Sequence, residues 1–231
     1  MLILAIETTG PLASCALSDG IHTEQIINHT EYSHLEEIVP MVKKLLEEQS
    51  VKPEELDAIA VSRGPGSFTG IRIGVATAKG LAQVWNKPII TVPTLESFAY
   101  GKEQGDVVIA PLFDARRSQV YAGAYTTAVN KAKTLVPGAA YGINEFLEKL
   151  AKAAKKKTVV FYGDGCEPYK EALENYPGAH RFAEEECRFQ LAENVVQLAQ
   201  LMFEKGELTD CFGAEPEYMR LAEAERKLKE K

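Results

Sequence analysis

The sequence of 231 residues predicts a two-lobe α/β fold in which a β-meander followed by crossover helices occurs twice. Short turns separate three strand-like segments at residues 2–7, 13–18 and 23–28, a spacing typical of a meander. Near residue 105 the pattern begins again with an apolar strand that ends in an acid, as the first strand does. We therefore expect two lobes, residues 1–105 and 106–231.

The rest of the first lobe follows from periodicity. We expect a helix at 33–49, a strand at 58–62, a helix at 69–85, a strand at 88–92 and a helix that begins near Thr94. Apolar residues three or four positions apart predict the buried face of the helix at 33–49: Leu35, Ile38, Val39, Val42, Leu45 and Leu46.

The second lobe should open with strands at 107–114 and 120–125. A helix at 144–154, a strand at 158–162, a helix near 168–174 and a long helix at 190–205 should follow. The residues after Gly213 look like a tail.

A glycine-rich run at residues 62–74 joins a strand to the helix that follows it. Gly70 and Gly74 lie inside that helix, where each costs about 1 kcal/mol relative to alanine. With Ala78 and Ala82 they form a row of small residues spaced by four, which allows close approach of a second helix. We interpret this row as a contact surface.

The same helix is apolar on more of its circumference than one core covers. If one face packs inside the lobe, the other leaves an exposed apolar patch, and such patches usually mark partner sites. The alternative is a central helix covered by the chain's own tail.

Composition excludes several function classes. A net charge of −7 argues against direct binding of nucleic acid, whose binding proteins usually carry a basic surface. The chain shows no transmembrane segment, and its apolar start lacks a basic leader, so we expect a cytoplasmic protein. The four cysteines lack metal-ligand spacing, which predicts reduced thiols.

Three motifs carry a resemblance: LAIETT at residues 4–9, GPGSFTGIRIG at 64–74 and EPEYMR at 215–220. Together they resemble the TsaB (YeaZ) family, the dimerisation subunit of bacterial tRNA threonylcarbamoyladenosine synthesis, and the likeness runs nearly end to end. The resemblance implies the actin/hexokinase-like ATPase (ASKHA) fold. It also implies a non-catalytic scaffold in the complex that adds threonylcarbamoyl to N6 of adenosine 37 of tRNAs reading ANN codons.

The resemblance further implies the partners. TsaD would bind directly and hold the metal, TsaE would join through the TsaB–TsaD pair and supply ATPase cycling, and TsaC would make the activated intermediate. This chain would then need no cofactor, would contact tRNA only indirectly, and could form a homodimer when alone. The expected interface lies on the helices at 33–49 and 69–85 and includes His34, Met41, Gly70, Arg72, Ile73, Gly74, Thr77, Ala78 and Leu81.

The nucleotide cleft of this fold looks degenerate. Working ATPases follow the acid at the end of each hairpin strand with glycine and hydroxyl residues, so that backbone N–H groups reach phosphate. The corner at residues 7–10 keeps two hydroxyls after Glu7, whereas the corner at 114–118 has no glycine and two arginines. Weak nucleotide binding stays open because arginines also clamp phosphates. Asp164, between two glycines, marks either a base or sugar contact or a simple tight turn.

This sequence lacks the histidine pair that forms the catalytic metal site of the related TsaD subunits. Those subunits carry a His-x-x-x-His pair on the helix after the strand that corresponds to residues 88–92, and here Thr94 and Phe98 stand in its place. None of the four histidines has ligand spacing. Two alternatives stay open: a small-molecule kinase, which needs a competent phosphate cleft, and a degenerate glycoprotease-like protein, which needs the histidine pair.

Overall fold

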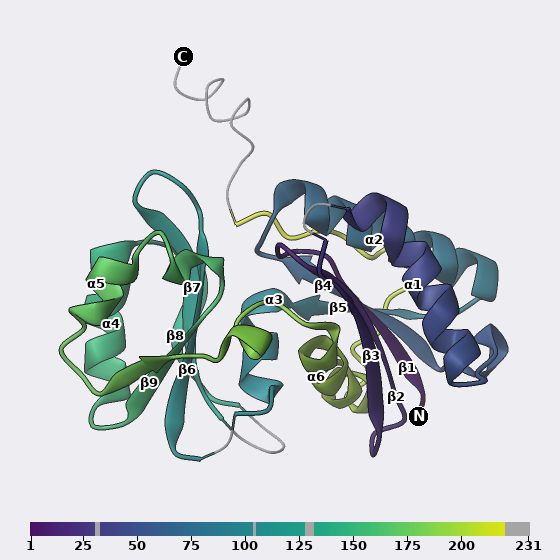
Figure 1. The fold of residues 1–231 in the computed structure, drawn as a ribbon. Coiled ribbons are helices and arrows are strands. Elements are labelled where there is room, and N and C mark those ends of the chain that lie inside the picture. The colour runs from purple at the N-terminus through teal and green to yellow at the C-terminus, as the bar shows by residue number, and fades with distance from the viewer. Residues whose placement is uncertain (31–32, 104, 128–131, 220–231) are drawn as a thin grey trace.

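The computed structural model describes residues 1–30, 33–103, 105–127 and 132–219. Two five-stranded mixed sheets lie side by side, each with helices packed on it (Figure 1). The first has the order β3-β2-β1-β4-β5 and the second the order β8-β7-β6-β9-β10. Each strand of one sheet thus has an equivalent in the other, which confirms the predicted duplication and two-lobe α/β fold.

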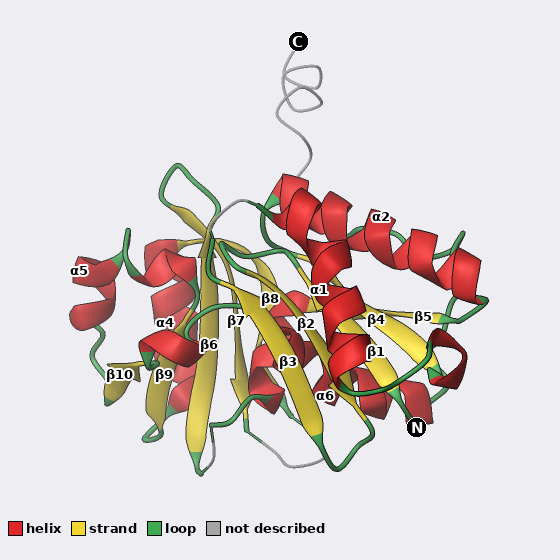
Figure 2. Cartoon of the chain, turned by 45° about the vertical axis from the view of Figure 1, so that its right-hand side comes forward, coloured by secondary structure: helices red, strands yellow, loops and turns green. Residues whose placement is uncertain are grey.

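The first lobe follows the predicted order closely. Its elements are β1 (Ile3–Glu7), β2 (Ala13–Ser18), β3 (Thr23–Asn28), α1 (His34–Glu48), β4 (Ala58–Gly64), α2 (Phe68–Trp85) and β5 (Ile89–Pro93). β1 pairs antiparallel with β2 and parallel with β4, as a meander followed by a crossover requires. α1 and α2 pack on one face of this sheet, where they bury Ile38, Leu45 and Val75 against the strands (Figure 2).

The chain enters the second lobe through α3 (Thr94–Ser97) and a 3-10 turn. The second lobe contains β6 (Val107–Asp114), β7 (Gln119–Thr126), β8 (Thr134–Gly142), α4 (Ile143–Ala154), β9 (Thr158–Tyr162), α5 (Lys170–Glu174) and β10 (His180–Phe182). α4 and α5 cover one face of its sheet, with Phe146 and Leu173 fully buried. The pattern did not predict β8 or β10.

The last helix, α6 (Ala192–Glu204), returns to the first lobe. It packs on the face of the first sheet opposite α1 and α2, where Val195 and Ala199 meet Ile3 and Ala60. The predicted boundary at residue 105 falls between the two sheets, but α6, Thr209 and Ala214 lie against the first lobe. Among the described residues, no helix is long and apolar enough to cross a membrane. All four cysteines are free.

The interpretation of the residues after Gly213 as a tail is wrong for residues 214–219. Ala214 is fully buried beside α2, and the Glu217 amide donates a hydrogen bond to the Arg63 carbonyl at 2.7 Å. We call residues 214–219 the C-terminal strap. The basic run at 226–231 lies outside the described residues.

Candidate functional site

The first corner, residues 7–10, lies between β1 and β2 and is closed by its own acid. The Glu7 carboxylate accepts hydrogen bonds from the Thr9 amide, 2.5 Å from Oε1, and from the Ser62 hydroxyl at Oε2. Burial raises the pKa of Glu7 above its ordinary value, although these hydrogen bonds and one from the Thr8 amide oppose the shift. A bound phosphate would need the N–H groups of Thr8 and Thr9. In this structure both groups are directed at the Glu7 carboxylate instead.

The glycine row of α2 covers this corner. A Cβ atom at Gly70 would overlap the Thr8 carbonyl, and one at Gly74 would overlap the Thr8 hydroxyl. The Thr8 hydroxyl also donates a hydrogen bond to the Gly70 carbonyl, at 2.7 Å. Ala78 is likewise fully buried. The prediction that Gly70, Gly74 and Ala78 face a partner is wrong, because these residues let α2 approach the chain's own β1–β2 corner.

His34 and Met41 also fail as interface residues. Both side chains are buried, and His34 Nε2 donates a hydrogen bond to the Gly10 carbonyl at 2.9 Å. Nδ1 is buried without a partner among the described residues. His34 therefore holds the first turn of α1 against the corner and is not available to a partner.

The second corner, residues 114–118, is tight and strained. Arg116, Arg117 and Ser118 all have left-handed backbones, with φ of 63°, 57° and 58°. Each such non-glycine residue costs about 1–2 kcal/mol. The corner binds its own acid: the Arg116 amide and the Tyr169 hydroxyl donate to Asp114 Oδ1 at 2.8 and 3.2 Å, and the Arg116 guanidinium lies 3.1 Å from Oδ2.

Asp164 lies beside this corner, in a turn whose glycines have structural reasons. Gly163 has φ of +93°, and Gly165 packs on the Leu112 carbonyl, so both are required by the turn. Desolvation of the carboxyl group raises the pKa of Asp164 to about 6; the Asp114 carboxylate adds to the shift, while a hydrogen bond from the Asp114 amide opposes it.

The two positions that correspond to the missing histidine pair belong to the core. Thr94 is fully buried and accepts a hydrogen bond from the Gly64 amide at 3.2 Å. Phe98 packs its ring against Phe113 and Tyr162 of the second sheet, with centroids 5.9 and 5.4 Å apart. Over residues 1–30, 33–103, 105–127 and 132–219, no group of three or more His, Cys, Asp or Glu side chains could hold a metal ion.

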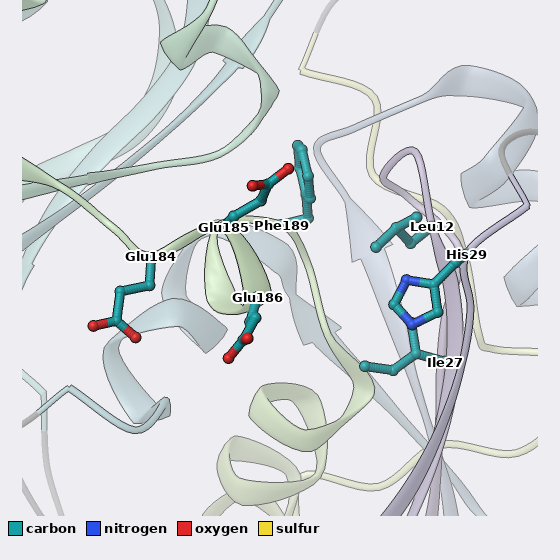
Figure 3. Close-up of a pocket in the computed structure, with 7 residues that line it drawn as sticks. All are labelled: Leu12, Ile27, His29, Glu184, Glu185, Glu186 and Phe189. Carbon is teal, nitrogen blue, oxygen red and sulfur yellow. The ribbon is translucent and has the colours of Figure 1, made fainter.

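A pocket of about 590 Å³ opens beside the first corner (Figure 3). Leu12, Ile27 and His29 line one side of it, and Phe189 with the glutamates at 184–186 lines the other. Three carboxylates at its rim repel a phosphate group. With both corners bound to their own acids, the residues present do not fit an ATP phosphate chain, and we derive no chemistry through a nucleotide.

α1 and α2 both carry large apolar side chains that are exposed. Leu35 is 72% and Val39 49% exposed on α1, and Val84 is 80% exposed on α2. The prediction that Leu35 and Val39 belong to the core is wrong. The two helices lie next to each other (Figure 1). We define the helix-pair surface by exposed or partly exposed residues of α1 and α2: Leu35, Val39, Arg72, Ile73, Ala76, Gly80 and Val84.

Sequence reasoning found part of this surface. Of the predicted residues, Arg72 is exposed and Ile73 is partly exposed, and both belong to it. Thr77 and Leu81 are partly exposed but lie outside it. Ala76 and Gly80 were missed, although they too are small residues spaced by four. A Cβ atom at Gly80 would meet nothing within 4 Å, so this glycine, unlike Gly74, faces open space.

The sequence matches one family model over residues 19–228, that of TsaD, tRNA N6-adenosine threonylcarbamoyltransferase. It is 36% identical to the tRNA threonylcarbamoyladenosine biosynthesis protein TsaB of Bacillus subtilis, over 98% of this chain and 97% of that protein. The protein of the same name from Escherichia coli is 30% identical over 99% of this chain and 98% of its own length.

A solved structure gives the same result. YeaZ from Pseudomonas aeruginosa superposes with a TM-score of 0.79 and 29% identity, over 94% of this chain and 99% of that one. The agreement extends over both lobes, since nearly the whole of each chain is covered. The chain belongs to the TsaB (YeaZ) family.

Proposed function

We propose that this chain is a non-catalytic subunit of tRNA threonylcarbamoyladenosine biosynthesis that binds TsaD through the helix-pair surface. The observation that carries the proposal is the contrast between two regions of the first lobe. The corner that would do chemistry is buried under α2, while the outer faces of α1 and α2 expose Leu35, Val39 and Val84. The names of the curated relatives supply the pathway.

The small residues of the surface suit a helix-to-helix contact. Ala76 and Gly80 are one turn apart and have no bulky side chain, so a helix of the partner can approach at the short end of the roughly 8–10 Å packing range. The flanking Leu35, Val39 and Val84 would add apolar area around that contact. Since TsaD matches this chain as a family, the partner would present equivalent helices.

In this proposal TsaD holds the metal and the activated threonylcarbamoyl group, TsaC makes that group, and TsaE joins through the TsaB–TsaD pair. The chain itself needs neither ATP nor a metal. Its net charge of −7 makes the contact with tRNA indirect. Without TsaD, the same surface would support a homodimer in the cytoplasm.

Reconstitution tests the proposal. With TsaC, TsaD, TsaE, ATP, threonine, bicarbonate and unmodified tRNA, threonylcarbamoyladenosine should form only when this chain is present, as mass spectrometry of digested tRNA will show. Leu35→Asp should behave like omission of the chain, because it places a charge in the apolar contact. The fold should tolerate this variant, since an acid in the first turn of a helix is favourable.

Ile21→Asp is the matched control. Ile21 is an equally exposed apolar residue, 86% accessible, but it lies in the β2–β3 turn away from both helices. It should leave product formation unchanged. Full modification without the chain contradicts the scaffold role, and ATP turnover by the isolated chain above about 1 s⁻¹, an ordinary enzyme rate, supports a kinase instead.

A further inference from the structure

The C-terminal strap runs along α2 and is held by side chains of α2 and of the end of β4. Lys79 donates to the Ala214 carbonyl at 3.1 Å, and Arg63 Nε lies 2.7 Å from Glu217 Oε2. At the end of the strap, Met219 packs into the core of the second lobe. The strap therefore fixes Tyr218 at the start of α2, beside the helix-pair surface.

Tyr218 completes a cluster with two residues of α2. The centroid of its ring lies 5.1 Å from that of the Phe68 ring. Its hydroxyl accepts a hydrogen bond from Arg72 Nε at 2.9 Å. The Arg72 guanidinium stacks over the Phe68 ring, 3.9 Å from its centroid. These contacts fix the guanidinium plane, so an exposed and normally mobile side chain is held in one orientation.

The cluster leaves the functional end of Arg72 free. The neighbouring cations Arg63 and Lys79 both have oxygen partners in the strap. For Arg72, only Nε has an acceptor within the described part of the chain. Its two terminal nitrogens form a planar fork that matches a carboxylate in bidentate geometry. An arginine held by aromatic rings is also the type of residue that dominates protein interfaces.

The partner follows from charge and position. Arg72 lies one turn before Ala76 on α2, and both are exposed, so the cluster continues the helix-pair surface. A nucleic acid would need several cations, whereas this chain has a net charge of −7 and Arg72 is a single guanidinium at an apolar surface. A side-chain carboxylate of a protein partner fits better than a phosphate chain.

We propose that Arg72, oriented by Phe68 and the strap residue Tyr218, binds a carboxylate of TsaD at the edge of the helix-pair surface. This inference rests on the proposed function, because it names the polar contact of that same interface. Phe68 and Tyr218 act as positioning residues: they reduce the conformational entropy that the arginine loses on binding.

Isothermal titration of the full chain with purified TsaD tests it. Arg72→Met should weaken the affinity about tenfold and Arg72→Glu about a hundredfold, because the second variant opposes a carboxylate with a like charge. Arg72→Lys should lose most of what Arg72→Met loses, since lysine lacks the planar fork and the stacking. Tyr218→Ala, with the guanidinium intact but no longer held, should lose a smaller part, and the wild-type affinity should fall with added salt.

Lys170→Glu on α5 is the control, because it makes the same charge reversal on an exposed side chain of the second lobe and should bind TsaD like the wild type. If wild-type chain binds TsaD but Arg72→Glu binds equally well, this inference is wrong and the proposed function stands. If Arg72→Glu loses tRNA binding and keeps TsaD binding, the arginine recognises phosphate and the inference is also wrong. If the wild type does not bind TsaD, the proposed function itself fails.

Discussion

Gly74 lies directly against the side chain of Thr8, so closely that a Cβ atom at position 74 would overlap the Thr8 hydroxyl. This contact joins α2 to the first corner and decides what a side chain at position 74 would do. It also separates two glycines of one helix that look equivalent in the sequence, Gly74 and Gly80.

Gly74→Leu should destabilise the fold. Overpacking against Thr8 and Val61 should cost about 3 kcal/mol, which corresponds to a fall in Tm of roughly 6–12 °C for a chain of this size. Differential scanning calorimetry measures the change. A variant with unchanged Tm would mean that α2 does not pack on the corner as described.

Gly80→Leu should do the opposite. Because a side chain at position 80 meets open space and helix propensity improves by up to about 1 kcal/mol, Tm should not fall and should rise by up to about 2–4 °C. The branched side chain should block the approach of a partner helix and lower the affinity for TsaD at least tenfold. Surface plasmon resonance checks the affinity. Unchanged binding would move the interface away from the middle of α2.

Asp164 should make stability depend on pH. Its pKa is raised to about 6 in the folded state, so the native protein binds more protons than the unfolded chain between pH 4 and 6, and stability falls as the pH rises through that window. Asp164→Asn removes this loss. It should raise Tm by about 1–2 °C at pH 8, since solvent screening reduces the effect, and should leave Tm unchanged near pH 3.5.

Asp164→Asn also tests whether Asp164 has a role in the reaction or only in the turn. If Asp164 only belongs to a tight turn, Asp164→Asn should keep full activity in the reconstituted reaction. Loss of product with TsaD binding intact would assign the second corner a role in the reaction, against the interpretation given above.

Local pattern was enough to predict most of the fold. Short turns separate β1 from β2 and β2 from β3, so the bounds of these three strands differ from prediction by one residue at most. β8 was missed because Pro137 and Gly138 lie inside it, and both residues are unfavourable in strands. β10 has three residues, too few for any periodicity.

The candidate site was harder to predict because small residues have two uses. Gly74 and Gly80 both lie in α2, and both permit close approach, but which surface approaches depends on where the helix lies against the sheet. Leu35 and Val39 show that apolar residues are equally ambiguous in a sequence pattern. Their spacing fits a core helix, whereas the structure exposes them. Tertiary contact, which no local pattern contains, decides each case.

The return of α6 to the first sheet has a consequence for synthesis of the protein. Ile3, Ala5 and Ala60 belong to strands that are made early, but the helix that covers them ends at Glu204. On the ribosome, one face of the first sheet stays uncovered until nearly the whole chain has emerged. The lobe that is translated first is thus completed last, and chaperones that bind nascent chains would meet this face for most of that time.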